Sequence, residues 1–379
     1  MCKKAIIAMS GGVDSSAAAA LMLEKGFHCF GITLKLYRGE GVCCSLADID
    51  DARNVSLNLG MEHHVLDFTE EFEEQVVRHF IETYEQGLTP NPCIECNRRI
   101  KFNLPLLMQG LMQASKTFAS KMFTSRMFTS KMFTSTIPLP FVFDFFVTGH
   151  YARVTQDALS GRFLLQKALD DKKDQSYVLY SLTQQQLGKA CFPLGALAKN
   201  EVRKIAKDRK LVNAAKKESQ DICFVPDGDY GNFIEKYTGK AYPHGDIVDL
   251  EGKIIGRHKG LIRYTIGQRR GLGVAANAPV YVTAKSTAAN TVTLGPDSAL
   301  YSKSLTAGNI NLIACPDLKK PMRVMVKTRY LQAAQLAVAE QTGTDCLHIE
   351  FDSLQRAITP GQAAVMYDGD VVVGGGTIM

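Results

Sequence analysis

The residues best suited to chemistry begin in a short stretch near the start of the chain, residues 3–16. Apolar residues 5–9 predict a buried strand, the Ser-Gly-Gly turn 10–12 breaks it, and Asp14 then opens an alanine-rich helix that ends near Gly26. A strand that enters a helix through such a turn can cradle a phosphate, because backbone N–H groups and the helix dipole favour an anion. The stretch therefore predicts a phosphate-binding turn; a Gly-rich turn capped by serine is the alternative.

The second chemical signal is a pair of thiols in the spacing C-x-x-C, Cys93 and Cys96. Arg98, Arg99 and Lys101 follow closely, and positive charge near a helix start lowers the pKa of a thiol and makes it reactive. The same spacing is also half of a zinc site. Because no second C-x-x-C or H-x-x-x-H follows downstream, we favour a working thiol over a metal ligand.

The composition is that of an ordinary globular protein of 379 residues, with 46% hydrophobic and 22% charged residues, and this length has room for two or three domains. No apolar run reaches the about 18 residues of a membrane-spanning helix and no export signal is evident, so we expect a cytoplasmic protein with no membrane partner. In that compartment ten cysteines favour thiol or metal chemistry over a disulfide scaffold. The net charge of +6 permits a polyanionic partner without requiring one.

Strands and helices alternate after the first turn, with strands expected at 28–36 and 64–68 and helices at 48–59 and 70–86. This alternation predicts an α/β domain with a doubly wound parallel sheet and a ligand at the carboxyl edge of its strands. From about residue 240, short strands separated by Gly, Asp and Asn turns predict a small β-rich domain. A second all-β stretch from about residue 300 resembles a small β-barrel.

One segment does not fit this pattern, because residues 103–146 contain four tandem five-residue repeats of the type K-M-F-T-S at 116–135. A period of five matches neither a helix nor a strand, so no continuous apolar face can form. We expect the repeats to form a disordered surface loop within an insertion. The alternative is an RNA contact, since basic residues interleaved with Phe can pair with phosphates and stack on bases.

Residues 10–16 read S-G-G-V-D-S-S, which resembles the PP-loop of the ATP pyrophosphatases. The other common phosphate loop, G-x-x-x-x-G-K-[ST], is absent. The resemblance implies cleavage of ATP between its α- and β-phosphates, with Mg²⁺ neutralising the phosphates and Asp14 helping to position that ion. It also implies which residues contact ATP, namely Ala8, Met9, Ser10, Gly11, Gly12, Val13, Asp14, Ser15, Leu34 and Gly149.

Together with N-P-C-I-E-C-N-R-R-I-K-F at 91–102, this loop resembles the MnmA family of tRNA-specific 2-thiouridylases, which replace the C2 oxygen of the wobble uridine with sulfur. Six further motifs occur in the expected order: T-G-H-Y-A-R (148–153), K-D-Q-S-Y (173–177), S-Q-D-I-C-F-V (219–225), Y-T-I-G-Q-R-R-G-L-G (264–273), K-T-R-Y (327–330) and I-T-P-G-Q (358–362). The resemblance covers nearly the whole chain except the insertion. It implies a PP-loop catalytic domain at 1–215, a central β-rich domain at 216–300 and a C-terminal β-barrel at 301–379.

The family resemblance implies catalytic roles for Cys96, Cys223 and Asp14. Cys223 lies in an apolar segment, 222–225, that by itself predicts a short strand with a buried thiol. By resemblance, Cys223 carries a persulfide sulfur, and Cys96 either resolves that persulfide as a disulfide or assists its release; the sequence leaves both routes open. A variant that also stays open is an iron–sulfur cluster held by Cys93, Cys96 and Cys223.

The same resemblance implies a tRNA substrate of the Lys, Glu or Gln type and a sulfur-relay protein or cysteine desulfurase as persulfide donor. The residues implied in tRNA contact are Asn91, Pro92, Cys93, His150, Lys173, Asp174, Gln175, Arg329, Tyr330 and Gln362. Two alternatives stay open: another PP-loop adenylating enzyme of the GMP-, argininosuccinate- or NAD-synthetase type, and a tRNA-binding relative without catalysis. The first needs neither paired cysteines nor a basic C-terminal barrel, and the intact loop with both thiols argues against the second.

Overall fold

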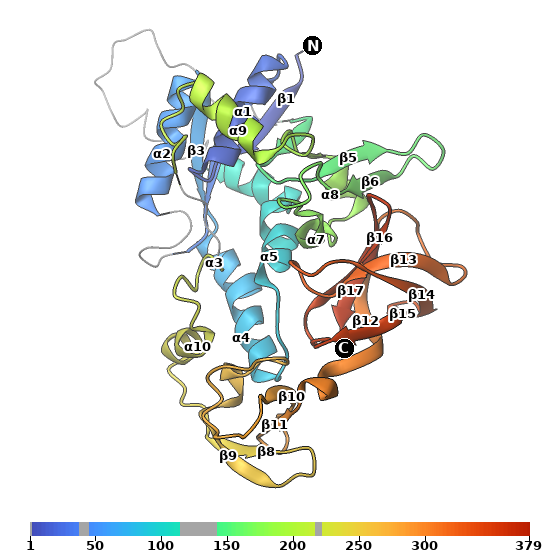
Figure 1. Cartoon of the computed structure of the whole chain (residues 1–379). Coiled ribbons are helices and arrows are strands. Elements are labelled where there is room, and N and C mark those ends of the chain that lie inside the picture. Colours follow the sequence, from blue (N-terminus) through green and yellow to red (C-terminus); the bar gives the residue numbers. More distant parts are fainter. Residues whose placement is uncertain (1, 38–44, 114–141, 217–221) are drawn as a thin grey trace. The chain divides into compact units, whose positions relative to one another are not determined.

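Two units make up the chain in the computed structural model, which describes residues 2–37, 45–113, 142–216 and 222–379 (Figure 1). The first unit is Met1–Gln75 with Glu95–Phe224, and the second is Val76–Ile94 with Val225–Met379. The repeats at 116–135, predicted to form a surface loop or an RNA contact, lie outside the described residues.

A parallel sheet of five strands forms the centre of the first unit, in the order β3-β2-β1-β4-β7. These strands are β1 (Lys4–Ala8), β2 (His28–Lys35), β3 (Glu62–Asp67), β4 (Phe145–Val147) and β7 (Ala190–Cys191). The chain runs outward from β1 to β3 and then returns to β4 on the other side of β1. Ligands of such sheets bind where the strand order reverses, beyond the carboxyl ends of the strands, which here is next to β1 and β4. The predicted doubly wound α/β fold is confirmed.

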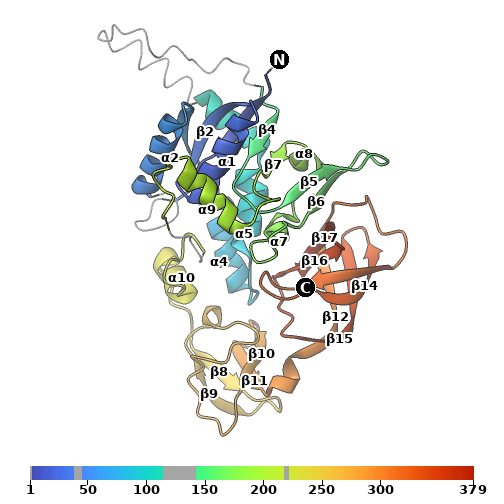
Figure 2. The same cartoon turned by 45° about the horizontal axis from the view of Figure 1, so that its top comes forward.

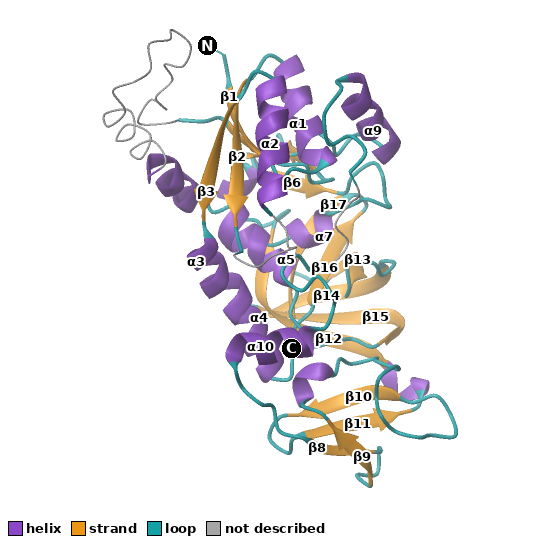
Figure 3. Cartoon of the chain, turned by 90° about the vertical axis from the view of Figure 1, so that its left-hand side faces the viewer, coloured by secondary structure: helices purple, strands orange, loops and turns teal. Residues whose placement is uncertain are grey.

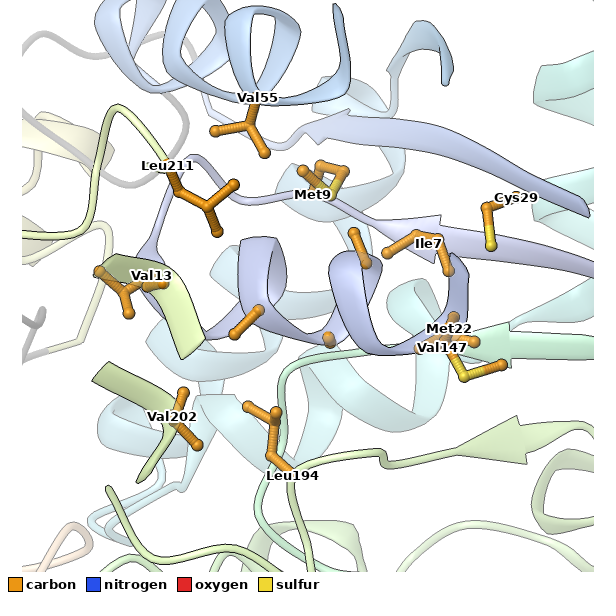
Figure 4. Close-up of a cluster of buried hydrophobic side chains, with 14 of the residues drawn as sticks. Ile7, Met9, Val13, Met22, Cys29, Val55, Val147, Leu194, Val202 and Leu211 are labelled. Carbon is orange, nitrogen blue, oxygen red and sulfur yellow. The ribbon is translucent and has the colours of Figure 1, made fainter. Parts of the chain in front are cut away.

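Three helices contribute to the core on one face of this sheet: α1 (Val13–Glu24), α2 (Leu46–Asn58) and α9 (Lys199–Asp208). Figure 2 shows α9 beside α1. In α1 the alanines at 17–20 are at most 2% exposed, and their small side chains let the helix lie close to the sheet. Figure 4 shows the apolar core between these elements, which includes Ile7, Met22, Val55 and Val202. This packing fixes the two ends of the turn between β1 and α1.

Aromatic side chains form a second buried cluster in the first unit. Phe102 lies edge-on to Phe146 of β4 and to Phe192, with ring centres 5.3 and 5.9 Å apart. Phe146 alternates along β4 with Phe145 and Val147, so it faces the opposite side of the sheet from the helical core. A helix begins at residue 104 and continues through 113, so the expected insertion at 103–146 is folded at both of its described ends.

The predicted helix over 70–86 is confirmed but contains a π-helical turn, as α3 (Thr69–Phe72), η1 (Glu73–Val77) and α4 (Arg78–Glu85) follow without a break. The thiol pair lies on a similar segment, where α5 (Pro92–Glu95) continues as the π-helical η2 (Cys96–Lys101). Such turns are frequent at functional sites. The first unit also contains the β-hairpin β5 (Arg153–Gln156) and β6 (Phe163–Gln166) and the short helices α7 (Ser176–Leu179) and α8 (Gln184–Leu187).

Strands dominate the second unit and are drawn in orange in Figure 3. Its smaller sheet, in the order β10-β11-β8-β9, consists of β8 (Gly245–Val248), β9 (Ile254–His258), β10 (Tyr281–Ser286) and β11 (Thr291–Gly295), and helix α10 (Tyr230–Thr238) precedes it. The other strands are β12 (Tyr301–Leu312), β13 (Met322–Lys327), β14 (Gln335–Gly343), β15 (Cys346–Arg356), β16 (Ala363–Asp368) and β17 (Val371–Ile378). They close into a barrel because β12 pairs with both β15 and β17. The predicted β-rich region and barrel are confirmed.

No helix in the described part of the chain is long and apolar enough to span a membrane.

Candidate active site

The turn between β1 and α1 has the geometry of a phosphate cradle. Gly11 has a φ of +71°, a conformation that favours glycine, and Gly12 is the N-cap of α1 without a side-chain capping bond. The Ser15 hydroxyl organises the turn, since it donates to the Gly12 carbonyl at 3.0 Å and accepts from the Ser10 N–H at 3.2 Å. Because the N-cap Gly12 has no side chain that could cap α1, the first N–H groups of the helix can bind an anion.

Three of the predicted ATP contacts lie at the carboxyl ends of the first two strands. Met9 follows β1 and donates its N–H to the carbonyl of Ile32 at 2.7 Å. Ala8 pairs with Ile32 in the sheet, so Leu34 of β2 extends two residues beyond the end of β1. The structure therefore brings Ala8, Met9 and Leu34 to the edge of the sheet where the cradle begins.

Asn213 holds the turn from the protein interior. Its side chain is 3% exposed, and its Nδ2 donates to the Gly11 carbonyl and to the Ser16 hydroxyl, both at 2.9 Å. Helix α2 closes the same position, because a Cβ on Gly11 would lie 2.3 Å from the carbonyl oxygen of Asp48. Sequence reasoning missed Asn213, since a single Asn after an amphipathic helix carries no recognisable signal.

Lys216 ties the segment that follows Asn213 to α2. Its Nζ lies 2.7 Å from Asp48 and 2.6 Å from Asp51. Burial alone would raise the pKa of Asp48, but hydrogen bonds from Lys216 and Ser45 outweigh burial and hold that pKa below its usual range. The chain that leads toward Cys223 is thus anchored beside the phosphate cradle at residue 216.

A cation from a distant part of the chain reaches the cradle. The Nζ of Lys199, the first residue of α9, lies 2.6 and 2.8 Å from the two carboxylate oxygens of Asp14. The Tyr151 hydroxyl donates to the same carboxylate at 2.9 Å, and the ammonium lies 5.5 Å from the centre of the Tyr151 ring. The Lys199 side chain is 12% exposed. Sequence reasoning missed Lys199, which in the sequence is one basic residue among many on an amphipathic helix.

Gly149 packs directly against the cradle. A Cβ at this position would lie 2.7 Å from the Ser15 nitrogen and 2.8 Å from the Asp14 carbonyl carbon. Both neighbours are backbone atoms at the start of α1 and cannot rotate away. Gly149 therefore lies against the turn at the start of α1, where only glycine fits, and its contact with ATP stays a prediction.

We expect Gly149→Ala to weaken ATP binding at least about tenfold and to lower the free energy of unfolding by about 1–3 kcal/mol, because the added methyl must push the turn out of place. Equilibrium dialysis with labelled ATP and urea denaturation measure the two effects. Gly343→Ala is the matched control, since its Cβ would meet no atom closer than 3.5 Å. ATP affinity that is equal in both variants would contradict the assigned position of the nucleotide.

His150 lies beside Gly149 in a largely apolar setting. Its Nδ1 is 2.7 Å from the Thr148 hydroxyl, and its ring centre is 6.1 Å from those of Phe102 and Phe192. Burial, with a smaller effect of the Lys101 charge, lowers the pKa of His150 to about 3. The imidazole is therefore neutral near pH 7, so the predicted tRNA contact would be a hydrogen bond and not an ion pair.

The K-D-Q motif, residues 173–175, forms hydrogen bonds with the backbone around Tyr151. Gln175 accepts a hydrogen bond from the Tyr151 N–H at 2.9 Å and donates its own N–H to the Tyr151 carbonyl at 2.8 Å. Asp174 is 6% exposed and accepts from the N–H groups of Ala168 and Ser176 and from the Ser176 hydroxyl. Both side chains thus hold the protein's own backbone, while Lys173 is half-buried at the edge of this loop. Their contact with tRNA stays a prediction.

The three candidate thiols differ in exposure. Cys93 is exposed on α5, whereas Cys96 is 7% exposed at the first position of η2. Arg99, one of the basic neighbours of Cys96, forms an ion pair with Glu95. Cys223 is half-buried in a turn, so the predicted strand at 222–225 is wrong. Phe224 of this apolar run is nevertheless buried, because it packs edge-on against Phe72 with ring centres 5.8 Å apart.

No group of three or more His, Cys, Asp or Glu side chains suited to a metal ion occurs among the described residues, which include Cys93, Cys96 and Cys223. The iron–sulfur variant therefore gains no support from this part of the chain.

The predicted tRNA contacts of the second unit are largely engaged within that unit. Arg329 donates through Nη2 to the carbonyls of Ile266 and Ala357 at 3.1 and 3.2 Å, and to the Thr359 hydroxyl at 2.6 Å. Tyr330 is half-buried beside it. Asn91 is half-buried and Pro92 is buried at the start of α5. The contact of these residues with tRNA likewise stays a prediction.

Family models match nearly the whole chain in three consecutive parts. A tRNA methyl transferase HUP domain matches residues 3–126 and 130–227, a tRNA methyl transferase PRC-barrel domain matches 231–296, and an aminomethyltransferase beta-barrel domain matches 302–378. Among curated proteins, the tRNA-specific 2-thiouridylase MnmA of Clostridioides difficile is 43% identical over 384 residues, covering 100% of this chain and 98% of its own.

Other relatives of the same name show the same extent of similarity. That of Acetivibrio thermocellus is 43% identical, covering 99% of each chain, and that of Heliobacterium modesticaldum is 44% identical, covering 99% of this chain and 92% of its own. The matches span the phosphate cradle, both thiols and the barrel. The chain therefore belongs to the MnmA family of tRNA-specific 2-thiouridylases.

Proposed function

We propose that this protein uses ATP to replace the C2 oxygen of a tRNA wobble uridine with sulfur. The observation that carries the proposal is identity of 43% along the whole chain to proteins named tRNA-specific 2-thiouridylase. The cradle at residues 10–15 adds a site suited to a nucleotide, and the thiols of Cys96 and Cys223 add a means of handling sulfur.

The residues of the cradle fit a triphosphate. Uncapped N–H groups at the start of α1 can bind phosphate oxygens, Lys199 supplies a cation, and the missing Cβ of Gly149 leaves the turn undisturbed. Ala8, Met9 and Leu34 would line the adenosine. Mg²⁺, when bound, would neutralise phosphate charge, with the Asp14 carboxylate as its protein contact; a single carboxylate is common for this ion.

The reaction then has three steps: activation of the uridine, transfer of sulfur and release of the thiolated base. The uridine C2 oxygen attacks the α-phosphate, pyrophosphate leaves, and the base becomes an adenylate. The outer sulfur of a persulfide on Cys223 attacks C2, and AMP leaves with the former C2 oxygen. The Cys96 thiolate attacks the inner sulfur, which frees the thiolated base and leaves a Cys96–Cys223 disulfide for an external thiol to reduce. Single-stranded loops present such splayed bases to proteins.

The same proposal includes the tRNA substrates, the persulfide donor and the cellular compartment. The tRNAs are those for Lys, Glu and Gln, the persulfide comes from a sulfur-relay protein or a cysteine desulfurase, and the protein works in the cytoplasm. Residues 1–215 form the catalytic domain, 216–300 the central domain and 301–379 the barrel. The tRNA contacts are Asn91, Pro92, Cys93, His150, Lys173, Asp174, Gln175, Arg329, Tyr330 and Gln362.

The proposal is tested with unmodified tRNA, ATP, Mg²⁺ and a persulfide donor. We expect mass spectrometry of the digested tRNA to find 2-thiouridine, with one AMP formed for each. A tRNA-binding relative without catalysis would bind tRNA and form neither product. Another adenylating enzyme would form AMP at a rate that does not depend on tRNA. Either of these results would contradict the proposal.

A further inference from the structure

The Asp14 carboxylate is held by Tyr151 and Lys199, and both of these residues are fixed by one loop, residues 170–175. The Tyr151 hydroxyl donates to Oδ1 of Asp14 at 2.9 Å, and the Nζ of Lys199 lies 2.6 and 2.8 Å from the two carboxylate oxygens. Tyr151 is 3% exposed and the side chain of Lys199 is 12% exposed. All of these residues belong to the first unit. The orientation of Asp14 therefore depends on residues that are distant from it in the sequence.

Gln175, at the end of this loop, fixes the backbone of Tyr151. The Gln175 side chain accepts from the Tyr151 N–H at 2.9 Å, and the Gln175 N–H donates to the Tyr151 carbonyl at 2.8 Å. One residue thus engages both backbone polar groups of Tyr151, while the hydroxyl of the same tyrosine reaches Asp14. The loop therefore sets the place from which that hydroxyl donates.

Asp170, at the start of the loop, fixes the first residue of α9. Its Oδ2 accepts from the Lys199 N–H and its Oδ1 from the Lys172 N–H, both at 3.1 Å. The N–H groups of a first helical turn have no acceptor within the helix, and a carboxylate there is also favoured by the helix dipole. Asp170 thus places the backbone from which the Lys199 side chain reaches Asp14.

We infer that Tyr151 and Asp170 are positioning residues of the ATP site: Tyr151 orients the Asp14 carboxylate, and Asp170 places Lys199 against it. The inference rests on the proposed function for its catalytic consequence, because Asp14 and Lys199 are assigned there to the triphosphate and its Mg²⁺. The same loop carries the K-D-Q motif that is predicted to contact tRNA, so one loop would meet the RNA and hold the ATP site.

The test uses two variants, each with a matched control. Tyr151→Phe removes the hydroxyl and keeps the ring, and its control is Tyr301→Phe, since Tyr301 is exposed on β12. Asp170→Ala removes both acceptor oxygens, and its control is Asp157→Ala. Asp157 also lies in the first unit and accepts from a backbone N–H of its own turn, that of Ser160 at 2.8 Å.

Two quantities would be measured for each variant, the affinity for ATP by equilibrium dialysis and the acetylation rate of Lys199 by peptide-resolved mass spectrometry. Lys207, which is exposed in the last turn of the same helix, is the internal reference for acetylation. Acetylation reports how accessible the Lys199 amine is, and it needs neither ATP nor tRNA.

For Tyr151→Phe and Asp170→Ala we expect ATP affinity to fall about five- to tenfold, because the pair of Asp14 and Lys199 is no longer held in place. Acetylation of Lys199 relative to Lys207 should be at least about threefold faster for the same reason. Both controls should stay within about twofold of wild type. Asp170→Asn can accept only one of the two N–H groups, so it should lie between wild type and Asp170→Ala, and it decides the matter if the Ala variant does not fold.

A double-mutant cycle tests whether Tyr151 acts through Asp14. In an Asp14→Ala background, Tyr151→Phe should change ATP affinity and Lys199 acetylation by less than about twofold, because the carboxylate that it orients is gone. Full additive effects in that background would overturn the role of Tyr151. Unchanged Lys199 acetylation in Asp170→Ala and Asp170→Asn would overturn the role of Asp170.

These measurements also separate the inference from the proposed function. Neither ATP binding nor acetylation needs turnover, so both positioning roles are decided even if the wild-type protein makes no 2-thiouridine. In that case the proposed function alone fails.

Discussion

Replacing Cys223 with serine is expected to reduce 2-thiouridine formation at least about 10³-fold while ATP binding stays within about twofold of wild type. A serine oxygen cannot hold the sulfur–sulfur bond through which the sulfur atom arrives. The nucleotide cradle should be unaffected, because its contacts described above run through Ser15, Asn213 and Lys199. Mass spectrometry of digested tRNA and equilibrium dialysis of ATP measure the two quantities.

Cys96→Ser should block a different step. Without the Cys96 thiolate, the base should stay joined to Cys223 through a disulfide, and this adduct should appear on a non-reducing gel and vanish with dithiothreitol. Cys2→Ser is the control for the loss of a thiol, because Cys2 is exposed and lies outside the residues assigned to ATP, sulfur transfer and tRNA. Multiple turnovers by Cys96→Ser in the absence of reductant would contradict the resolving role of Cys96.

Replacing Lys199 with methionine is expected to weaken ATP binding by about 10- to 100-fold. The change removes the one cation seen against the Asp14 carboxylate among the described contacts and leaves that negative charge facing the phosphates. Losing a hydrogen bond to a charged group costs about 1.5–3 kcal/mol, which corresponds to this range. The methionine side chain keeps most of the packing of the Lys199 side chain, which is 12% exposed.

Lys207→Met is the control for Lys199→Met. Lys207 lies in the last turn of the same helix, α9, and is exposed, so the two variants lose equal charge from one element. Titration with ATP at two salt concentrations separates a local contact from a general field effect, because screening weakens only the latter strongly. Equal ATP affinity for both variants would show that Lys199 serves the fold and not the nucleotide.

The features that were predicted correctly from the sequence are formed by residues close together in the chain. The cradle at 10–16 is a strand, a turn and a helix start within a few residues, so type and spacing suffice to identify it, and the structure agrees. Gly149 was named as an ATP contact by resemblance alone; the structure places it against this turn, where a Cβ would lie 2.7 Å from the Ser15 nitrogen.

What the sequence did not predict depends on distant packing. Lys199 reaches Asp14 across 185 residues because α9 packs beside α1, and no pattern within α9 distinguishes this lysine from its neighbours. The same holds for Asn213 beneath Gly11. The strand predicted around Cys223 is wrong because an apolar run indicates burial and not a particular secondary structure. Here Phe224 lies in a turn and is buried against Phe72.

The central step of the proposed mechanism is activation of the uridine oxygen itself by ATP. A tRNA carrying ¹⁸O at C2 of the wobble uridine tests this step in a single experiment with ATP, Mg²⁺ and a persulfide donor. If the adenylate forms at that oxygen, the AMP released should carry one ¹⁸O atom for each 2-thiouridine formed. If 2-thiouridine forms while the AMP stays unlabelled, ATP is consumed in another reaction and the proposed mechanism is wrong.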